Sequence, residues 1–184
     1  PKGQKFRDRY QRAIAQLKRD EPAYKAEEEA IKALNAKNPQ AALAALDKAV
    51  KRQPADGKFW ELRGHAWQMQ KNYTNAEKSF TTAIRKNPDL FSHYLARGAV
   101  RYKQGNKSGA EQDLKASNQR LPTAIASYYL GEIALTNGDK NSAIQYFQQA
   151  AQSDSEVGQK ARQRLSTLEL TTAPHKYIPS QPYI

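Results

Sequence analysis

The apolar residues of this chain recur at helical spacing, in short segments separated by polar turns. In residues 74–87, for example, Ala76, Phe80 and Ala83 are separated by mostly polar positions. Spacings of three and four place such residues on one face of a helix. The sequence therefore predicts an all-α protein built from amphipathic helices.

A larger pattern repeats along the chain at a nearly fixed interval. Its clearest copy comprises Gly64, Ala76, Phe80, Ala83 and Pro88. The next two copies are Gly98, Ala110, Leu114, Ser117, Pro122 and then Gly131, Ala143, Phe147, Ala150. A fixed period of this size predicts an array of similar supersecondary units rather than a single globular core. Counting back by one more period adds a degenerate first copy, so four repeats are expected, at residues 23–56, 57–90, 91–123 and 124–154.

Cap residues mark where the second helix of each repeat begins. Asn38, followed by proline, predicts a start in the first repeat. Thr74 with Glu77 three residues later is a capping box, which predicts that the second repeat's second helix begins at Thr74. Ser108 takes the same place in the third repeat, and Asn141 takes the cap position in the fourth.

Residues 5–19 predict a further helix before the first repeat. Its apolar residues lie on one face, at spacings of four, four and three: Phe6, Tyr10, Ile14 and Leu17. Pro22 is expected to end this helix, because proline interrupts helical hydrogen bonding. Residues 1–22 are thus predicted to form a lead-in helix whose apolar face covers the first repeat.

The end of the chain predicts a helix and then a tail. Residues 155–170 place four apolar residues on one face: Val157, Ala161, Leu165 and Leu168. A helix with an otherwise polar surface is what caps a repeat array. Residues 171–184 contain three prolines and no helical period, so we expect an extended Pro/Tyr tail.

With Trp60 four residues before Gly64, and Tyr73 three before Ala76, the second repeat resembles the tetratricopeptide repeat. This resemblance implies an α-solenoid of about four helix-turn-helix units, whose first helices line a concave groove. At groove positions it places these candidate partner-binding residues: Tyr24, Glu61, His65, Met69, Leu95, Tyr102, Tyr128, Glu132 and Leu135.

The implied ligand is a peptide or protein segment anchored on aromatic and aliphatic side chains. The chain's own tail, or that of a neighbouring copy, is a candidate ligand through Tyr177 and Tyr183. Chaperone-binding members of the family hold a terminal carboxylate with lysine, asparagine and arginine. The matching positions here include Glu27, Ile31, Ser92 and Ala96, so chaperone tails are not expected.

The sequence offers little catalytic chemistry. Cysteine is absent, which excludes disulfides, thiolate metal sites and a cysteine nucleophile. The three histidines belong to no H-E-x-x-H pair, and no G-x-S-x-G, Walker A or G-x-G-x-x-G string occurs. His65 and His93 could approach each other across neighbouring helices, but no third metal ligand is evident. Glu27, Glu28 and Glu29 point in different directions on a helix and predict a solvated face. We expect no catalysis, no metal and no cofactor in this chain.

The formal net charge of +12 is spread along the chain, and residues 124–155 are acidic. No block of five or six like charges marks a nucleic-acid arm, so a solvated basic surface is the leading interpretation. Nucleic-acid binding, as an RNA-associated helical repeat, is a less favoured one. No apolar run approaches the roughly 18 residues that span a membrane. No signal peptide is visible, and the chain begins without methionine, which indicates a fragment or processed product.

Three stretches carry a closer resemblance: NPDLFSHYLARGAVRYKQG, DLKASNQRLPTAIASYYLGEIAL and IQYFQQAAQ. They resemble the C-terminal arrays of bacterial periplasmic H-E-x-x-H zinc metallopeptidases. This resemblance implies a non-catalytic module that recruits substrates or partners to a zinc-bearing protease domain upstream, in the periplasm or cell envelope. A free-standing adaptor or co-chaperone, for which a cytoplasmic location is the alternative, also fits the repeats.

Overall fold

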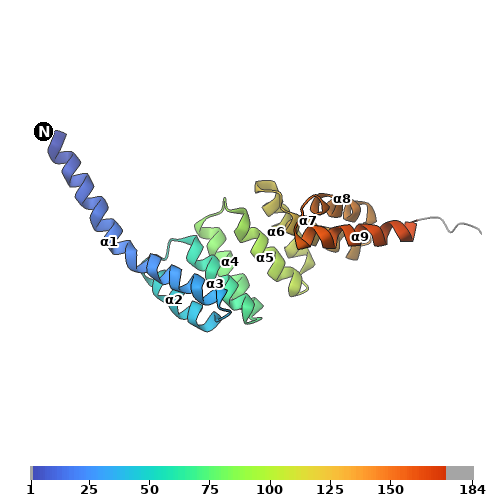
Figure 1. Ribbon diagram of the computed structural model, residues 1–184, viewed down its shortest axis with the longest axis horizontal. Helices are drawn as coiled ribbons and strands as arrows, with labels where there is room; N and C mark the ends of the chain where they lie inside the picture. The colour runs from blue at the N-terminus through green and yellow to red at the C-terminus, as the bar shows by residue number, and fades with distance from the viewer. Residues whose placement is uncertain (1, 173–184) are drawn as a thin grey trace, which may run out of the picture. The chain divides into compact units, whose positions relative to one another are not determined.

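The computed structural model describes residues 2–172, and this part of the chain forms nine α-helices and no strand (Figure 1). The expected all-α fold of helix-turn-helix units is confirmed. The helices are α1 (Lys2–Asn35), α2 (Pro39–Arg52), α3 (Gly57–Met69), α4 (Tyr73–Lys86), α5 (Phe91–Lys103), α6 (Lys107–Arg120), α7 (Ala124–Thr136), α8 (Lys140–Ala151) and α9 (Glu156–Thr172). They divide between two compact units, residues 1–120 and 121–184, which we describe separately.

The first unit stacks three helix pairs, α1 with α2, α3 with α4 and α5 with α6. Within this unit α2 also packs on α3, and α4 packs on α5. In the later pairs an aromatic or leucine side chain fills the core, as Phe80 and Leu114 do with no exposed surface. The first pair has Leu46 at the corresponding position, also with no exposed surface, and its other buried apolar residues are all alanines: Ala23, Ala26, Ala30, Ala42, Ala45 and Ala49.

The repeating glycine sits where the two helices of a pair approach each other. A Cβ placed on Gly64 would lie 2.5 Å from the ring of Phe80, and one on Gly98 would lie 2.9 Å from Leu114. Gly131 of the second unit repeats this, at 2.7 Å from Phe147. These distances are shorter than any ordinary carbon contact, so a larger residue would force the pair apart.

Most second helices begin one or two residues before the positions that the sequence predicted. The side chains of Asn72, Asn106 and Asp139 accept hydrogen bonds from the backbone amides of Asn75, Gly109 and Ser142. The predictions of Thr74, Ser108 and Asn141 as caps were therefore wrong. Asparagine and aspartate cap helices at least as well as serine and threonine, so the earlier polar residue takes the position. Asn38 caps α2 as predicted.

Each tight turn within a pair contains one residue in the left-handed conformation. Lys37 and Lys71 have φ of 55° and 58°, while Gly105 and Gly138 have φ of 81° and 79°. Each of these positions follows the previous one by a single repeat length, so the turn recurs with the array. Glycine adopts this backbone without steric cost, whereas lysine does not.

The first helix contradicts two predictions. α1 continues unbroken through Pro22 to Asn35, because one proline removes one backbone donor while Ala23, Ala26 and Ala30 hold the second half against α2 and α3. The first half projects beyond the helix stack, and no other described helix of the unit lies beside it (Figure 1). Its apolar face does not cover the first repeat, since Tyr10 and Leu17 are each 62% exposed.

The second unit consists of the α7–α8 pair and α9. Phe147 and Ala143 form its core together with Ala161 of α9, and Leu165 and Leu168 pack at its edge. A helix is therefore present where the sequence predicted the C-terminal one, and three of the four residues of its predicted apolar face, Ala161, Leu165 and Leu168, lie in or against this core. The expected tail, residues 171–184, lies almost wholly outside the described residues.

Candidate functional site

The first helices of the three pairs in the first unit are joined along one side by polar contacts. Glu27 of α1 forms an ion pair with Lys58 of α3. Glu61 of α3 lies 3.4 Å from His93 of α5, measured from Oε2 to Nε2. Each contact links a first helix to the first helix of the next pair at nearly the same offset. The contacts therefore fix which side of α1, α3 and α5 forms a shared surface.

We call this surface the inner face. By helical spacing it includes the six candidate residues of this unit and the exposed Ile31: Tyr24, Ile31, Glu61, His65, Met69, Leu95 and Tyr102. Three of its apolar residues are open to solvent, with Tyr24 at 51%, Met69 at 41% and Ile31 at 36% exposure. Leu95 and Tyr102 are half-buried. The inner face thus presents apolar side chains from all three first helices.

The charged groups of the inner face largely satisfy one another. The ion pair with Lys58 leaves Glu27 only 7% exposed. The prediction that Glu27, Glu28 and Glu29 all form a solvated face was wrong for Glu27. That carboxylate points toward α3, whereas Glu28 and Glu29 are exposed.

Two histidines and one glutamate form a small titratable group between α3 and α5. Burial lowers the pKa of His65, whose ring stacks edge-on against Phe80 with centroids 5.1 Å apart. Burial on its own would raise the pKa of Glu61, but hydrogen bonds with His93 and Ser92 outweigh it and lower that pKa. His93 is fully buried, with Nδ1 3.2 Å from the carbonyl oxygen of Asn87. The group therefore places a carboxylate at the inner face at neutral pH.

No trio of histidine, cysteine or carboxylate side chains among the described residues could hold a metal ion. None of the described helices is both long enough and apolar enough to cross a membrane. The positions that hold a ligand carboxylate in chaperone-binding relatives present little positive charge here. Glu27 is already paired, and Ile31 is an exposed apolar side chain.

The three candidate residues of the second unit make contacts within that unit. Tyr128 packs against Phe147 with ring centroids 5.6 Å apart, and it also touches Tyr129. Both carboxylate oxygens of Glu132 accept hydrogen bonds from Arg164 of α9, at 2.7 and 2.9 Å. Hydrogen bonds with Tyr128 and Glu132 raise the pKa of Arg164. Leu135 is partly buried beside the same core. These residues link α7 to α9, and their role toward a partner stays a prediction.

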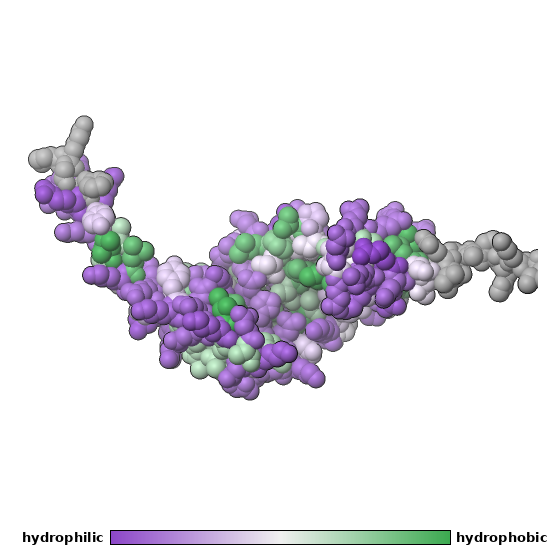
Figure 2. All heavy atoms as spheres, viewed as in Figure 1, coloured by the Kyte–Doolittle hydropathy of each residue, from purple (hydrophilic) through white to green (hydrophobic). Residues whose placement is uncertain are grey.

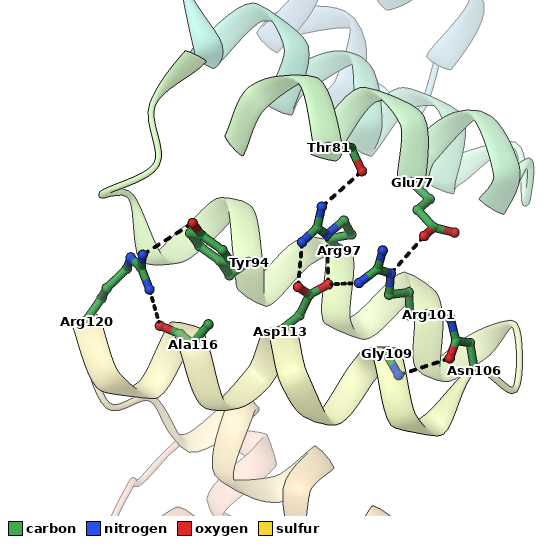
Figure 3. Close-up of polar contacts among 10 residues, drawn as sticks. All are labelled: Glu77, Thr81, Tyr94, Arg97, Arg101, Asn106, Gly109, Asp113, Ala116 and Arg120. Carbon is green, nitrogen blue, oxygen red and sulfur yellow. Dashed lines mark hydrogen bonds and ion pairs between the residues drawn. The ribbon is translucent and has the colours of Figure 1, made fainter. Parts of the chain in front are cut away.

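Sequence reasoning missed an arginine network between α4, α5 and α6 (Figure 3). Arg97 donates two hydrogen bonds to Asp113, at 2.8 and 2.7 Å, and a third to the Thr81 hydroxyl. Arg101 donates to Asp113 at 3.0 Å and to Glu77 at 2.8 Å. Arginines four residues apart, with acids on both neighbouring helices, were the available signal. The network fixes α5 between its neighbours.

Comparison with known proteins identifies the repeat. The tetratricopeptide repeat profile matches residues 28–91, 65–124 and 95–157, which together cover more than half of the chain. No curated protein matches the sequence.

Solved structures share the fold at low sequence identity. The chain is similar to MamA 41-end from Desulfovibrio magneticus RS-1, with 21% identity, a TM-score of 0.71 and coverage of 82% of this chain and 85% of that one. It is also similar to the first repeat domain of Spaghetti (RPAP3) bound to an HSP90 peptide, with 20% identity, a TM-score of 0.63 and coverage of 65% and 95%. The second domain of human RPAP3, in complex with an HSP70 peptide, has 20% identity and a TM-score of 0.60. The match covers 62% of this chain and 97% of that one.

Proposed function

Because the chain belongs to the tetratricopeptide repeat family, we propose that it is a non-catalytic module that binds a peptide or protein segment on the inner face of its first unit. The fold is typical of protein–protein interaction modules, and two of the similar structures hold chaperone peptides. The single observation that carries the proposal is the exposure of Tyr24, Ile31 and Met69 on neighbouring first helices.

The chemistry of the inner face favours an apolar segment over a carboxylate terminus. Its acidic residues repel a terminal carboxylate, and Lys58 is already paired with Glu27. Exposed tyrosine, isoleucine and methionine offer polarisable contacts that adapt to different side chains. The preferred ligand is therefore a short segment with aromatic or aliphatic anchors, either extended or helical. The chain's own tail, or that of another copy, meets this description through Tyr177 and Tyr183.

Selection from a random peptide library on the immobilised chain tests this proposal. The enriched peptide is then titrated against Ile31→Glu, Met69→Glu and Tyr102→Ala. Each substitution should weaken binding at least about tenfold, since burying one such side chain contributes about 1.5–3 kcal/mol. Leu90→Glu is the matched control, because Leu90 is 39% exposed and lies in the turn before α5. Equal loss in Leu90→Glu and Ile31→Glu would show that the peptide binds elsewhere.

The finer part of the proposal is that this module serves a zinc metallopeptidase domain of the same protein, in the periplasm or cell envelope. It is supported by the three stretches that resemble the arrays of such proteases. An antibody against this 20.7 kDa chain, applied to fractionated cells, tests both parts. We expect an envelope product more than twice that mass. A cytoplasmic product with about the mass of this chain alone would favour the free-standing adaptor.

A further inference from the structure

The projecting half of α1 presents an apolar stripe that no other described helix of the first unit covers. Tyr10 and Leu17 are each 62% exposed, and Ile14 lies between them along the same side. Figure 2 shows a hydrophobic patch on this part of the helix. A hollow of about 490 Å³ follows the stripe, lined by Ile14, Leu17, Lys18, Glu21, Tyr24, Lys25 and Glu28. An isolated helical segment of this length is marginal in water, so an apolar stripe on it indicates a partner.

The stripe continues without a break into the second half of α1. Tyr10, Leu17, Tyr24 and Ile31 are spaced by seven residues, and all four are exposed. Positions seven apart stay on the same face of a helix over several turns. The set is also symmetric about a point between Asp20 and Glu21. A second α1 running in the opposite direction would therefore place Tyr10 against Ile31 and Leu17 against Tyr24. Each of these contacts would occur twice, because the two helices are equivalent.

The charge of α1 is divided at the same point. Residues 2–19 contain seven basic and one acidic residue, whereas residues 20–35 contain five acidic and two basic residues. Parallel pairing would bring two basic halves together, which is unfavourable. Antiparallel pairing brings each basic half beside an acidic half, which is favourable over the whole length of the helix.

We propose that two copies of this chain associate through α1, as an antiparallel helix pair that buries the stripe from Tyr10 to Ile31. The occupant of the stripe is thus a second copy of the chain. The arrangement is isologous, because each helix presents the same stripe to the other. Self-association does not depend on peptide binding, since Tyr10 and Leu17 lie outside the inner face. Tyr24 and Ile31 belong to both surfaces, so a bound peptide should weaken the pair.

Sedimentation equilibrium of the full chain, from micromolar to hundreds of micromolar, tests the association. The mass should rise toward twice 20.7 kDa as the concentration increases. Leu17→Glu should weaken dimerisation at least about tenfold, because a leucine is buried on each side of the symmetry axis. Ala15→Glu is the matched control, with the same added charge at an exposed position on the opposite side of α1, and it should dimerise like the parent chain. Circular dichroism establishes that both variants keep their helix content.

A chain that stays monomeric throughout this range overturns the proposal, and so does an equal effect of Leu17→Glu and Ala15→Glu. The direction of pairing is tested separately by disulfide formation. The sequence contains no cysteine, so any disulfide must join the introduced residues. A mixture of Tyr10→Cys and Ile31→Cys chains should form a mixed disulfide under mild oxidation. A disulfide between two Tyr10→Cys chains, without the mixed product, would refute the antiparallel arrangement.

Measuring dimer formation and peptide binding on the same chain distinguishes a failure of the self-association proposal from a failure of the peptide-binding proposal. The dissociation constant should increase with salt, because the paired halves carry opposite charge. If the dimer forms and no peptide binds, only the peptide-binding proposal fails. If a peptide binds and the Leu17→Glu variant shows the same sedimentation mass as the parent chain at every concentration, only the self-association proposal fails.

Discussion

Replacing Asp113 by asparagine should destabilise the first unit more than any other single polar change in the arginine network. The Asp113 side chain is only 5% exposed, and it accepts three charged hydrogen bonds from Arg97 and Arg101. Asparagine has nearly the same shape, so the substitution removes the charge without opening a cavity. Only one of the two side-chain polar groups of asparagine, the carbonyl oxygen, accepts hydrogen bonds. The other is an NH2 donor that faces an arginine donor, so the three hydrogen bonds from Arg97 and Arg101 cannot all be kept.

The expected loss in free energy of unfolding depends on which hydrogen bonds Arg97 and Arg101 keep in the variant. Breaking a buried ion pair by removing one partner costs about 3–5 kcal/mol, because the other charge stays buried without compensation. Arg101 keeps Glu77, and Arg97 keeps the Thr81 hydroxyl. The two arginine side chains are 14% and 20% exposed, so water compensates part of the loss. We therefore expect the lower end of the range, about 3 kcal/mol.

Urea unfolding followed by circular dichroism measures this free energy, provided that the slope with denaturant is unchanged. Glu77→Gln is the control, because Glu77 is 28% exposed and contacts Arg101 alone within the network. It should cost about 1 kcal/mol or less. A loss below about 1 kcal/mol for Asp113→Asn, or an equal loss for the two variants, would refute the reasoning from burial.

Three further predictions concern the turns, the histidines and the helix contacts. Lys71→Gly should raise the free energy of unfolding by about 0.5–1 kcal/mol, because glycine relieves the left-handed turn, and Gly105→Lys should lower it; thermal unfolding measures both. The free energy of unfolding should fall as the pH drops below 6.5. The pKa of His65 is lower in the folded chain, so the unfolded chain binds the proton first. His65→Gln should therefore flatten the curve of urea midpoint against pH. Gly64→Ala should cost about 1–3 kcal/mol, since its Cβ meets the Phe80 ring at 2.5 Å, and adding Phe80→Leu should recover part of this loss in the same urea assay. A fully additive double variant would argue against that contact.

The fold was predictable from the sequence because the array repeats its own packing rule. The repeating glycines Gly64, Gly98 and Gly131 mark close helix contacts, and the large apolar residue that each one meets marks the partner helix, so the period identifies the pairs directly. The caps were less predictable, because an asparagine and a threonine two residues apart compete for the same role. Only the backbone geometry decides between Asn72 and Thr74.

The candidate site was predictable only in part. Position within the repeat selected Tyr24 and Met69, which are exposed on neighbouring helices, and their binding of a partner stays a prediction. It could not reveal that Glu132 is held by Arg164, because those residues are 32 positions apart and belong to helices of different role. The exposed stripe of α1 was also missed. Pro22 predicted an end to the helix, yet packing of the following alanines outweighed the loss of one hydrogen bond.

The nearly all-alanine interior of the α1–α2 pair has a consequence for how the array opens. Apart from Leu46, the buried apolar residues of α1 and α2 are alanines, which remove less apolar surface from water than phenylalanine, so this end gains less from packing than the α3–α4 pair, which buries Phe59 and Phe80. In a stack where each pair is supported only by its neighbours, the least supported end unzips first. Backbone amides of α2 should therefore exchange with deuterium sooner than those of α4. Any contact that covers α1 would slow that exchange, and would thereby set the order in which the repeats unfold.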